Sequence, residues 1–209
     1  MQHLNTRSKE LPRFSFPHVI SNELIAPGAF VGAILFSNYL LSAVPNVKLF
    51  DLLVFVAGYT LGLRRGISVA IAAWLVYGNI NPWGIAHVQL LVTLMASESL
   101  FAVAGAVTRK LLTPGQITLG VSKSTLAFVT SAALVTLIYD LVTNAYTGYF
   151  WATIAGSDDY GRWLMLGLFN PGALFFMAVH AGANLAFFPV FGPLFIKGAA
   201  WAKEHSRWG

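Results

Sequence analysis

Long stretches without charged residues are the feature that most restricts how this chain folds. Only 10% of its 209 residues are charged and 56% are hydrophobic, whereas soluble domains carry about 25% charged residues. A helix that crosses the hydrocarbon core of a bilayer needs roughly 20 mainly apolar residues. The composition therefore excludes a soluble globular protein and predicts an all-α integral membrane protein.

Six apolar stretches, separated by turns and loops, predict a bundle of six transmembrane helices. They cover approximately residues 25–44, 49–63, 66–80, 85–107, 126–146 and 170–189. The second and third are short, and only the pair Arg64 and Arg65 joins them. A longer connection, residues 147–169, leads to Asn170 and Pro171, an N-cap and first helical residue for the sixth stretch. We expect a cytosolic or interfacial segment over 1–24, the transmembrane domain over 25–189 and an interfacial tail over 190–209.

The basic residues predict the orientation of the chain. With the N-terminus inside, eleven of the thirteen Lys and Arg residues fall on the cytosolic side, and only Lys48 and Arg162 fall outside. Short cytosolic loops of membrane proteins are enriched in Lys and Arg. We therefore predict a multi-pass protein of the cell membrane with both termini in the cytosol. The net charge of +5 then reports orientation, so nucleic acid is not an expected partner.

Polar residues in and beside the apolar stretches define a candidate binding site. A charged group at bilayer depth costs about 3 kcal/mol, so a retained charge needs a partner, a cavity or a function. Together these residues outline a polar cavity reached from outside. The alternative is that the charged members only bond helices to one another. The candidate substrate-binding residues are Asp51, Asn81, Glu98, Asp140, Asn144, His180 and Asn184.

Small residues mark one face of the first apolar stretch. Gly28 pairs with Gly32, and Ala29 pairs with Ala33, each at a spacing of four. Such small-xxx-small pairs let a second helix approach closely. The second helix belongs either to the same chain or to a partner subunit.

Motifs for catalysis or nucleotide binding are missing. The chain has no cysteine and contains no H-E-x-x-H zinc pair or G-x-S-x-G nucleophile elbow. Residues 115–120 have two glycines at a phosphate-loop spacing, but no lysine follows them. We therefore expect no enzymatic activity, no cofactor and no bound metal. Any uphill transport must take its energy from a partner or from an ion gradient.

Three motifs resemble those of the substrate-binding S components of energy-coupling factor (ECF) transporters, which are importers of the ABC type. One is Val44-Pro45-Asn46-Val47 followed by residues 52–66 (LLVFVAGYTLGLRRG), the second is residues 139–144 (YDLVTN), and the third is Ala29-x-x-x-Ala33. The resemblance implies six helices that bind a vitamin-like micronutrient in an outer cavity. It also implies that the Ala29 face contacts a transmembrane coupling (T) subunit, which works with two ATPase subunits.

Three functions are consistent with these residues. The first is a subunit that captures a small solute for an ATP-driven importer, where the excess of acidic groups at depth favours a cationic or hydrogen-bond-rich solute. The second is an intramembrane enzyme that uses Glu98, Asp140 and His180 as acid/base groups or metal ligands. The third is a structural subunit of a larger membrane complex, in which the same helix faces are interfaces.

Overall fold

Helices account for nearly all of the chain that the structure describes. This structure is a computed structural model that describes residues 18–205, with side chains for residues 24–202. No β-strand is present in residues 18–205, so the predicted all-α class is confirmed. The helices are α1 (His18–Leu40), α2 (Phe50–Leu61), α3 (Leu63–Tyr77), α4 (Val88–Leu111), the 3-10 turn η1 (Pro114–Gln116), α5 (Lys123–Ile154), α6 (Tyr160–Phe169) and α7 (Pro171–His205).

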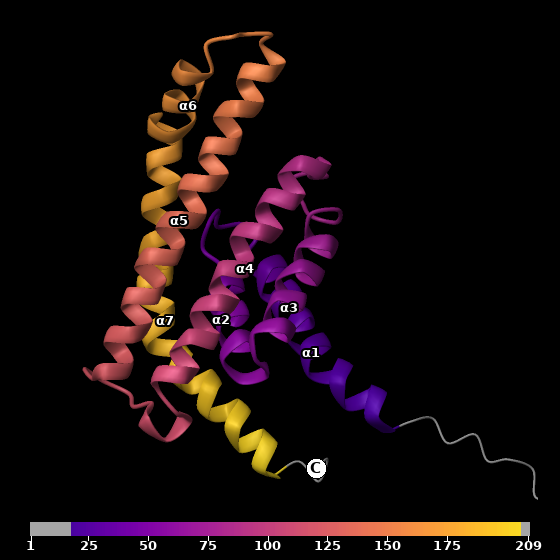
Figure 1. The fold of residues 1–209 in the computed structure, drawn as a ribbon, viewed down its shortest axis with the longest axis vertical. Coiled ribbons are helices and arrows are strands. Elements are labelled where there is room, and N and C mark those ends of the chain that lie inside the picture. Colours follow the sequence, from indigo (N-terminus) through magenta and orange to yellow (C-terminus); the bar gives the residue numbers. More distant parts are fainter. Residues whose placement is uncertain (1–17, 206–209) are drawn as a thin grey trace, which may run out of the picture.

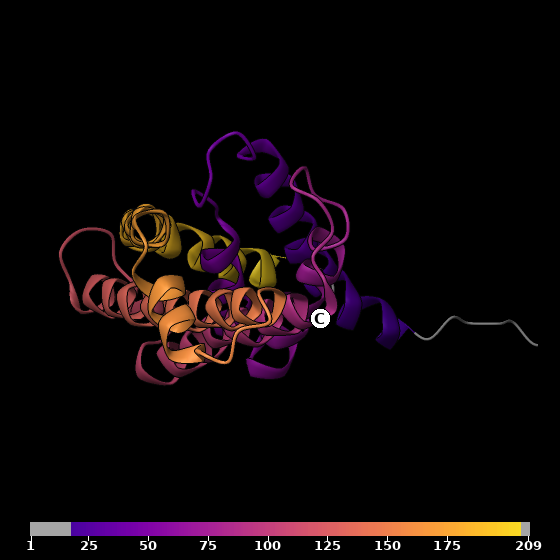
Figure 2. The same cartoon turned by 90° about the horizontal axis from the view of Figure 1, so that it is seen from above.

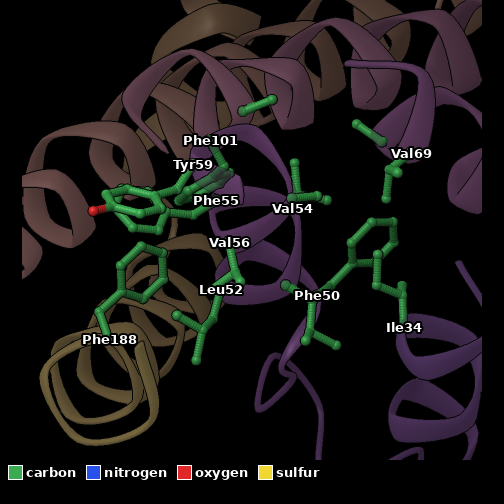
Figure 3. Packing of buried hydrophobic residues seen from close by; sticks show 14 of the residues in the cluster. Ile34, Phe50, Leu52, Val54, Phe55, Val56, Tyr59, Val69, Phe101 and Phe188 are labelled. Carbon is green, nitrogen blue, oxygen red and sulfur yellow. The ribbon is translucent and has the colours of Figure 1, made fainter. Parts of the chain in front are cut away.

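The short helix α2 lies at the centre of the molecule. It contacts α1, α3, α4 and α7, and ten of its twelve residues are buried. Its Phe55 ring lies 5.6 Å from the ring of Phe128 and 5.2 Å from that of Phe188. Figure 3 shows Phe55 and Phe188 in the same cluster as Leu52 and Tyr59. A helix that is apolar on all sides is buried on all sides, which explains why such a short apolar stretch forms the core.

The longer helices surround α2. Figure 1 shows α5 and α7 running side by side, with α6 folded back against one end of α5. Seen from above in Figure 2, α4 and α5 lie on one side of the molecule and α1 and α7 on the other. Side chains of α2, α5 and α7 meet in the interior, where the ring of Phe55 contacts those of Phe128 and Phe188.

Within the part of the chain that the structure describes, three helices are long and apolar enough to cross a membrane. They are α4, α5 and the Pro171–Ala202 part of α7. The Leu24–Leu40 part of α1 and the whole of α2 are apolar but shorter, and α3 has 15 residues. These lengths support a multi-pass membrane protein, while the predicted count of six spans stays a prediction.

The connection over residues 147–169 is mostly helical, which corrects the expectation of a loop. Helix α5 continues to Ile154, and α6 then packs against it. Two glycines allow α6 to approach α5 closely. A Cβ on Gly148 would lie 2.5 Å from the backbone oxygen of Trp163, and a Cβ on Gly167 would lie 2.5 Å from that of Asn144.

Several predicted boundaries also change. Helix α1 begins at His18, inside the predicted N-terminal segment, and ends at Leu40 instead of residue 44; residues 1–17 lie outside the description. Helix α7 begins at Pro171 as predicted, and Asn170 Oδ1 accepts a hydrogen bond from the Ala173 N–H at 2.9 Å. It does not end near residue 189 but runs on to His205. Its C-terminal part lies at an angle to the rest (Figure 1), as expected for a helix with internal prolines.

Candidate functional site

His180 of α7 lies between two carboxylates from two other helices. Its Nε2 atom is 2.6 Å from Asp51 Oδ2 of α2, and its Nδ1 atom is 2.8 Å from Asp140 Oδ1 of α5. All three side chains are largely buried. A neutral imidazole donates from only one of its nitrogens. Both contacts are hydrogen bonds only if one further proton is present, on the ring or on a carboxyl group.

Asn184 extends this cluster by one turn of α7. Its Nδ2 atom donates to Asp51 Oδ2 at 2.5 Å and to Thr136 Oγ1 of α5 at 2.8 Å. Thr136 precedes Asp140 by four residues on α5 and is fully buried, so the two occupy one helix face. This spacing from Asp140 was a usable sequence signal for Thr136, which is not among the predicted site residues. The cluster thus connects α2, α5 and α7 through five polar side chains.

The cluster borders a cavity of about 240 Å³. Asp51, Asp140, Asn144 and His180, four of the seven predicted site residues, line it together. Apolar and aromatic side chains, which predominate in most small-molecule sites, make up most of the remaining wall, together with the polar Asn46, Lys48 and Thr143. The other lining residues are Asn46, Lys48, Phe50, Trp74, Leu94, Tyr139, Thr143, Phe176 and Met177.

The loop between α1 and α2 covers one side of the cavity. Asn46, whose φ is +58°, donates from Nδ2 to the backbone oxygen of Phe176 on α7 at 3.2 Å. Lys48 Nζ donates to the Tyr77 hydroxyl at 3.2 Å and lies 4.7 Å from the centre of that ring. The loop is therefore fixed to both α7 and α3.

Glu98 lies outside the cavity lining but supports one wall. Its Oε2 atom accepts a hydrogen bond from Trp74 Nε1 at 3.3 Å, and the Trp74 ring stacks on Phe50 with centroids 5.1 Å apart. The other oxygen, Oε1, is buried without a hydrogen-bond partner among the described residues. The sequence indicated Glu98 by its charge, whereas Trp74 and Tyr139 gave no signal because aromatic residues are ordinary members of an apolar helix.

Asn81 does not join the other predicted site residues. It lies in the turn between α3 and α4, where Nδ2 donates to the backbone oxygens of Tyr77 and Gly84 and Oδ1 accepts from the Trp83 N–H. Such bonds to nearby backbone are the usual role of asparagine in turns. The structure therefore does not bring Asn81 together with the other predicted site residues, and its role in binding stays a prediction.

The cluster is not arranged as a metal site. Among residues 24–202, no group of three or more His, Asp or Glu side chains is placed to hold a metal ion. Asp51 and Asp140 approach different nitrogens of the His180 ring, so they do not converge on one point.

The small-residue face of α1 lies outside this site. A Cβ on Gly28 or Gly32 would meet no atom within 4 Å, so no other helix in the described part of the chain packs on these two glycines. Ala29 and Ala33 line an apolar groove of about 670 Å³ between α1, α2 and α7. The face is therefore available to another molecule.

The helices and the cavity together define a class, an α-helical membrane protein with a buried polar site. Comparison of the chain with protein-family models, with curated proteins and with solved structures finds no match. Function has to be argued from the geometry of the cavity.

Proposed function

We propose that this protein is a substrate-specific membrane subunit that captures a small, vitamin-like solute from outside the cell. The observation that carries the proposal is the polar cavity with Asp51, Asp140 and His180 in its wall. Charged side chains at membrane depth usually mark a solute or ion site. A few convergent polar groups on an otherwise apolar and aromatic wall are typical of small-molecule sites.

The distribution of basic residues supports an outward-facing cavity. Arg64 and Arg65 follow the end of α2, and Arg109 and Lys110 end α4. These two helix ends lie together, because the Tyr59 hydroxyl of α2 donates to the Leu112 backbone oxygen at 2.6 Å. The cavity lies beside the start of α2, at the other end of that helix. If the basic end is cytosolic, the cavity faces outward and both termini lie inside.

A partner has to supply energy if the solute moves uphill, and α1 offers a surface for it. We propose that the exposed Gly28 and Gly32 face and the groove beside Ala29 and Ala33 bind a transmembrane coupling subunit, which two ATPase subunits drive. Small residues allow close helix contact in a bilayer. The groove is entirely apolar apart from Ser37, which fits a contact within the membrane.

The experiment is to identify small molecules that copurify with the protein in mild detergent, using mass spectrometry. We expect one solute to copurify with the wild type and to be lost in Asp140→Asn. Asp158→Asn is the matched control, because Asp158 is exposed in the α5–α6 connection. A solute retained equally by all three proteins, or by none, would contradict the proposal. Ala29→Leu combined with Ala33→Leu should keep the bound solute and abolish uptake by cells.

The two alternative functions receive less support. An intramembrane enzyme receives less support because both ring nitrogens of His180, the predicted acid/base histidine, are already engaged by carboxylates. A purely structural subunit does not require a cavity lined by four ionisable side chains.

A further inference from the structure

We propose that the cavity binds a small organic cation with a planar, N–H-rich group, such as an amidine, a guanidine or a protonated nitrogen heterocycle. This proposal names the substrate class of the site and therefore rests on the proposed function. Three features of the cavity carry it: its charge, its free hydrogen-bond acceptors and its aromatic wall.

The charge of the cluster is unbalanced. Asp51 and Asp140 contribute two carboxylates, and their contacts with His180 require one proton beyond that of the neutral imidazole. Wherever that proton resides, the three groups together keep one negative charge. Lys48, the cation that lines the cavity, makes no ion pair with either carboxylate within 4 Å, and its ammonium is turned to Tyr77. A carboxylate charge without a direct ion-pair partner is costly in this setting, and a cationic ligand would supply that partner.

Each carboxylate also keeps one oxygen free for a ligand. Asp51 uses Oδ2 for His180 and Asn184, and Asp140 uses Oδ1 for His180. Within residues 24–202, Asp51 Oδ1 and Asp140 Oδ2 make no hydrogen bond, and neither is fully enclosed. An ionised carboxylate accepts hydrogen bonds and cannot donate them. The site therefore offers two acceptor oxygens, one from each carboxylate beside His180, which suits a ligand with several N–H donors.

Aromatic rings favour a flat cation over a compact one. The stacked pair Phe50 and Trp74 forms part of the wall, and Tyr139, 5.5 Å from the His180 ring, forms another part. Aromatic faces attract cations electrostatically and stack on planar groups. The volume of about 240 Å³ is below the range of roughly 300–1,000 Å³ found for larger ligands. A cavity of this volume fits a solute of about one ring.

Benzamidinium, benzamide and benzoate test this proposal, because they have nearly the same shape and differ in charge. Binding to the detergent-solubilised wild-type protein is measured by calorimetry after any copurified solute has been removed. We expect benzamidinium to bind roughly 10- to 100-fold more tightly than benzamide, as charge-assisted hydrogen bonds imply, and benzoate to bind most weakly. Equal or tighter binding of benzamide or benzoate overturns the cation proposal.

Variants separate this proposal from the proposed function. Asp51→Asn should remove most of the preference for benzamidinium over benzamide, whereas the exposed control Asp158→Asn should keep it. If an anionic or neutral solute copurifies with the wild type and is lost in Asp140→Asn, the capture function holds and the cation class is wrong. If no probe binds and no solute copurifies, both proposals are wrong. The wild-type series needs no variant, so a misfolded Asp51→Asn protein does not prevent the test.

Discussion

At the scale of single residues, His180 connects α7 to α2 and α5 through its contacts with Asp51 and Asp140. The stability of each contact depends on the other. Removing one partner of a buried ionic cluster leaves an uncompensated charge and typically costs about 3–5 kcal/mol. Asp51 and Asp140 would face the cavity without their shared donor if the imidazole were absent. The cluster should therefore show strong energetic coupling.

We predict that His180→Ala lowers the free energy of unfolding in detergent by about 3–5 kcal/mol. In the His180→Ala protein, Asp140→Asn replaces a carboxylate that has lost its partner by a neutral amide. The double variant should therefore lose about 1–3 kcal/mol less unfolding free energy than the sum of the two single losses. Unfolding of the four proteins of this cycle by denaturant gives the coupling energy directly. Additive losses would show that His180 and Asp140 do not depend on each other.

The sequence located much of this cluster but not its pairing. Asp140, His180 and Asn184 are conspicuous because polar groups are rare in apolar helices, and the i+4 spacing places His180 and Asn184 on one face. The contact of Asp51 with a residue 129 positions away depends on how each helix is rotated, which its apolar composition leaves open. Asn81 lies apart from the cluster because a polar residue in a turn has local backbone partners that a sequence does not display.

At the scale of helices, close backbone contact holds α2 in its central place. A Cβ on Gly105 of α4 would lie 2.0 Å from the backbone oxygen of Phe55, and a Cβ on Gly58 of α2 would lie 2.2 Å from that of Ala102. Contacts as short as these cannot be relieved by rotating a side chain. The two helices would have to separate, and the start of α2 carries Asp51.

Gly105→Ala should therefore destabilise the protein by about 1–3 kcal/mol, the usual cost of overpacking. Gly182→Ala in α7 is the matched control, because its added Cβ meets no atom within 4 Å and alanine favours a helix by up to about 1 kcal/mol over glycine. Thermal unfolding in detergent compares the two. Equal midpoints would mean that α2 and α4 are not packed as closely as described.

Six apolar stretches were enough to locate six of the seven α-helices found in residues 18–205, because each stretch must satisfy its own backbone hydrogen bonds in a membrane. They were not enough to locate α6 or the full lengths of α5 and α7. Helix α6 has ten residues and only Gly167 is buried, so its helicity depends on docking against α5 through the glycines at 148 and 167. That contact is tertiary, and hydropathy along the chain does not report it.

At the scale of the whole molecule, a basic end and a polar cavity lie at opposite ends of α2. An orientation with the basic end in the cytosol opens the cavity to solutes from outside, whereas the reverse orientation makes the same cavity an exit or a cytosolic site. The predicted function therefore depends on the topology, including whether the 15-residue helix α3 crosses the membrane.

Single cysteines can decide this topology because the natural chain contains none. Leu63→Cys and Val121→Cys introduce thiols at exposed positions of the basic end, and Ile80→Cys and Asp158→Cys introduce them at exposed positions in the α3–α4 and α5–α6 connections. We predict that a membrane-impermeant maleimide labels Ile80→Cys and Asp158→Cys on intact cells, and labels the other two only after permeabilisation. The wild type should remain unlabelled.

Each departure from this pattern has a specific meaning. Labelling of only Leu63→Cys and Val121→Cys on intact cells would show that the protein has the opposite orientation, which would contradict capture of a solute from outside. Labelling of Leu63→Cys together with Ile80→Cys on intact cells would mean that α3 does not cross, so the count of six spans would be wrong. If Asp158→Cys alone were protected, α5 would not cross, and the cavity formed between α2, α5 and α7 would lose its outward opening. The predicted pattern requires α3, α4 and α5 each to cross once, because these helices separate the four positions in sequence.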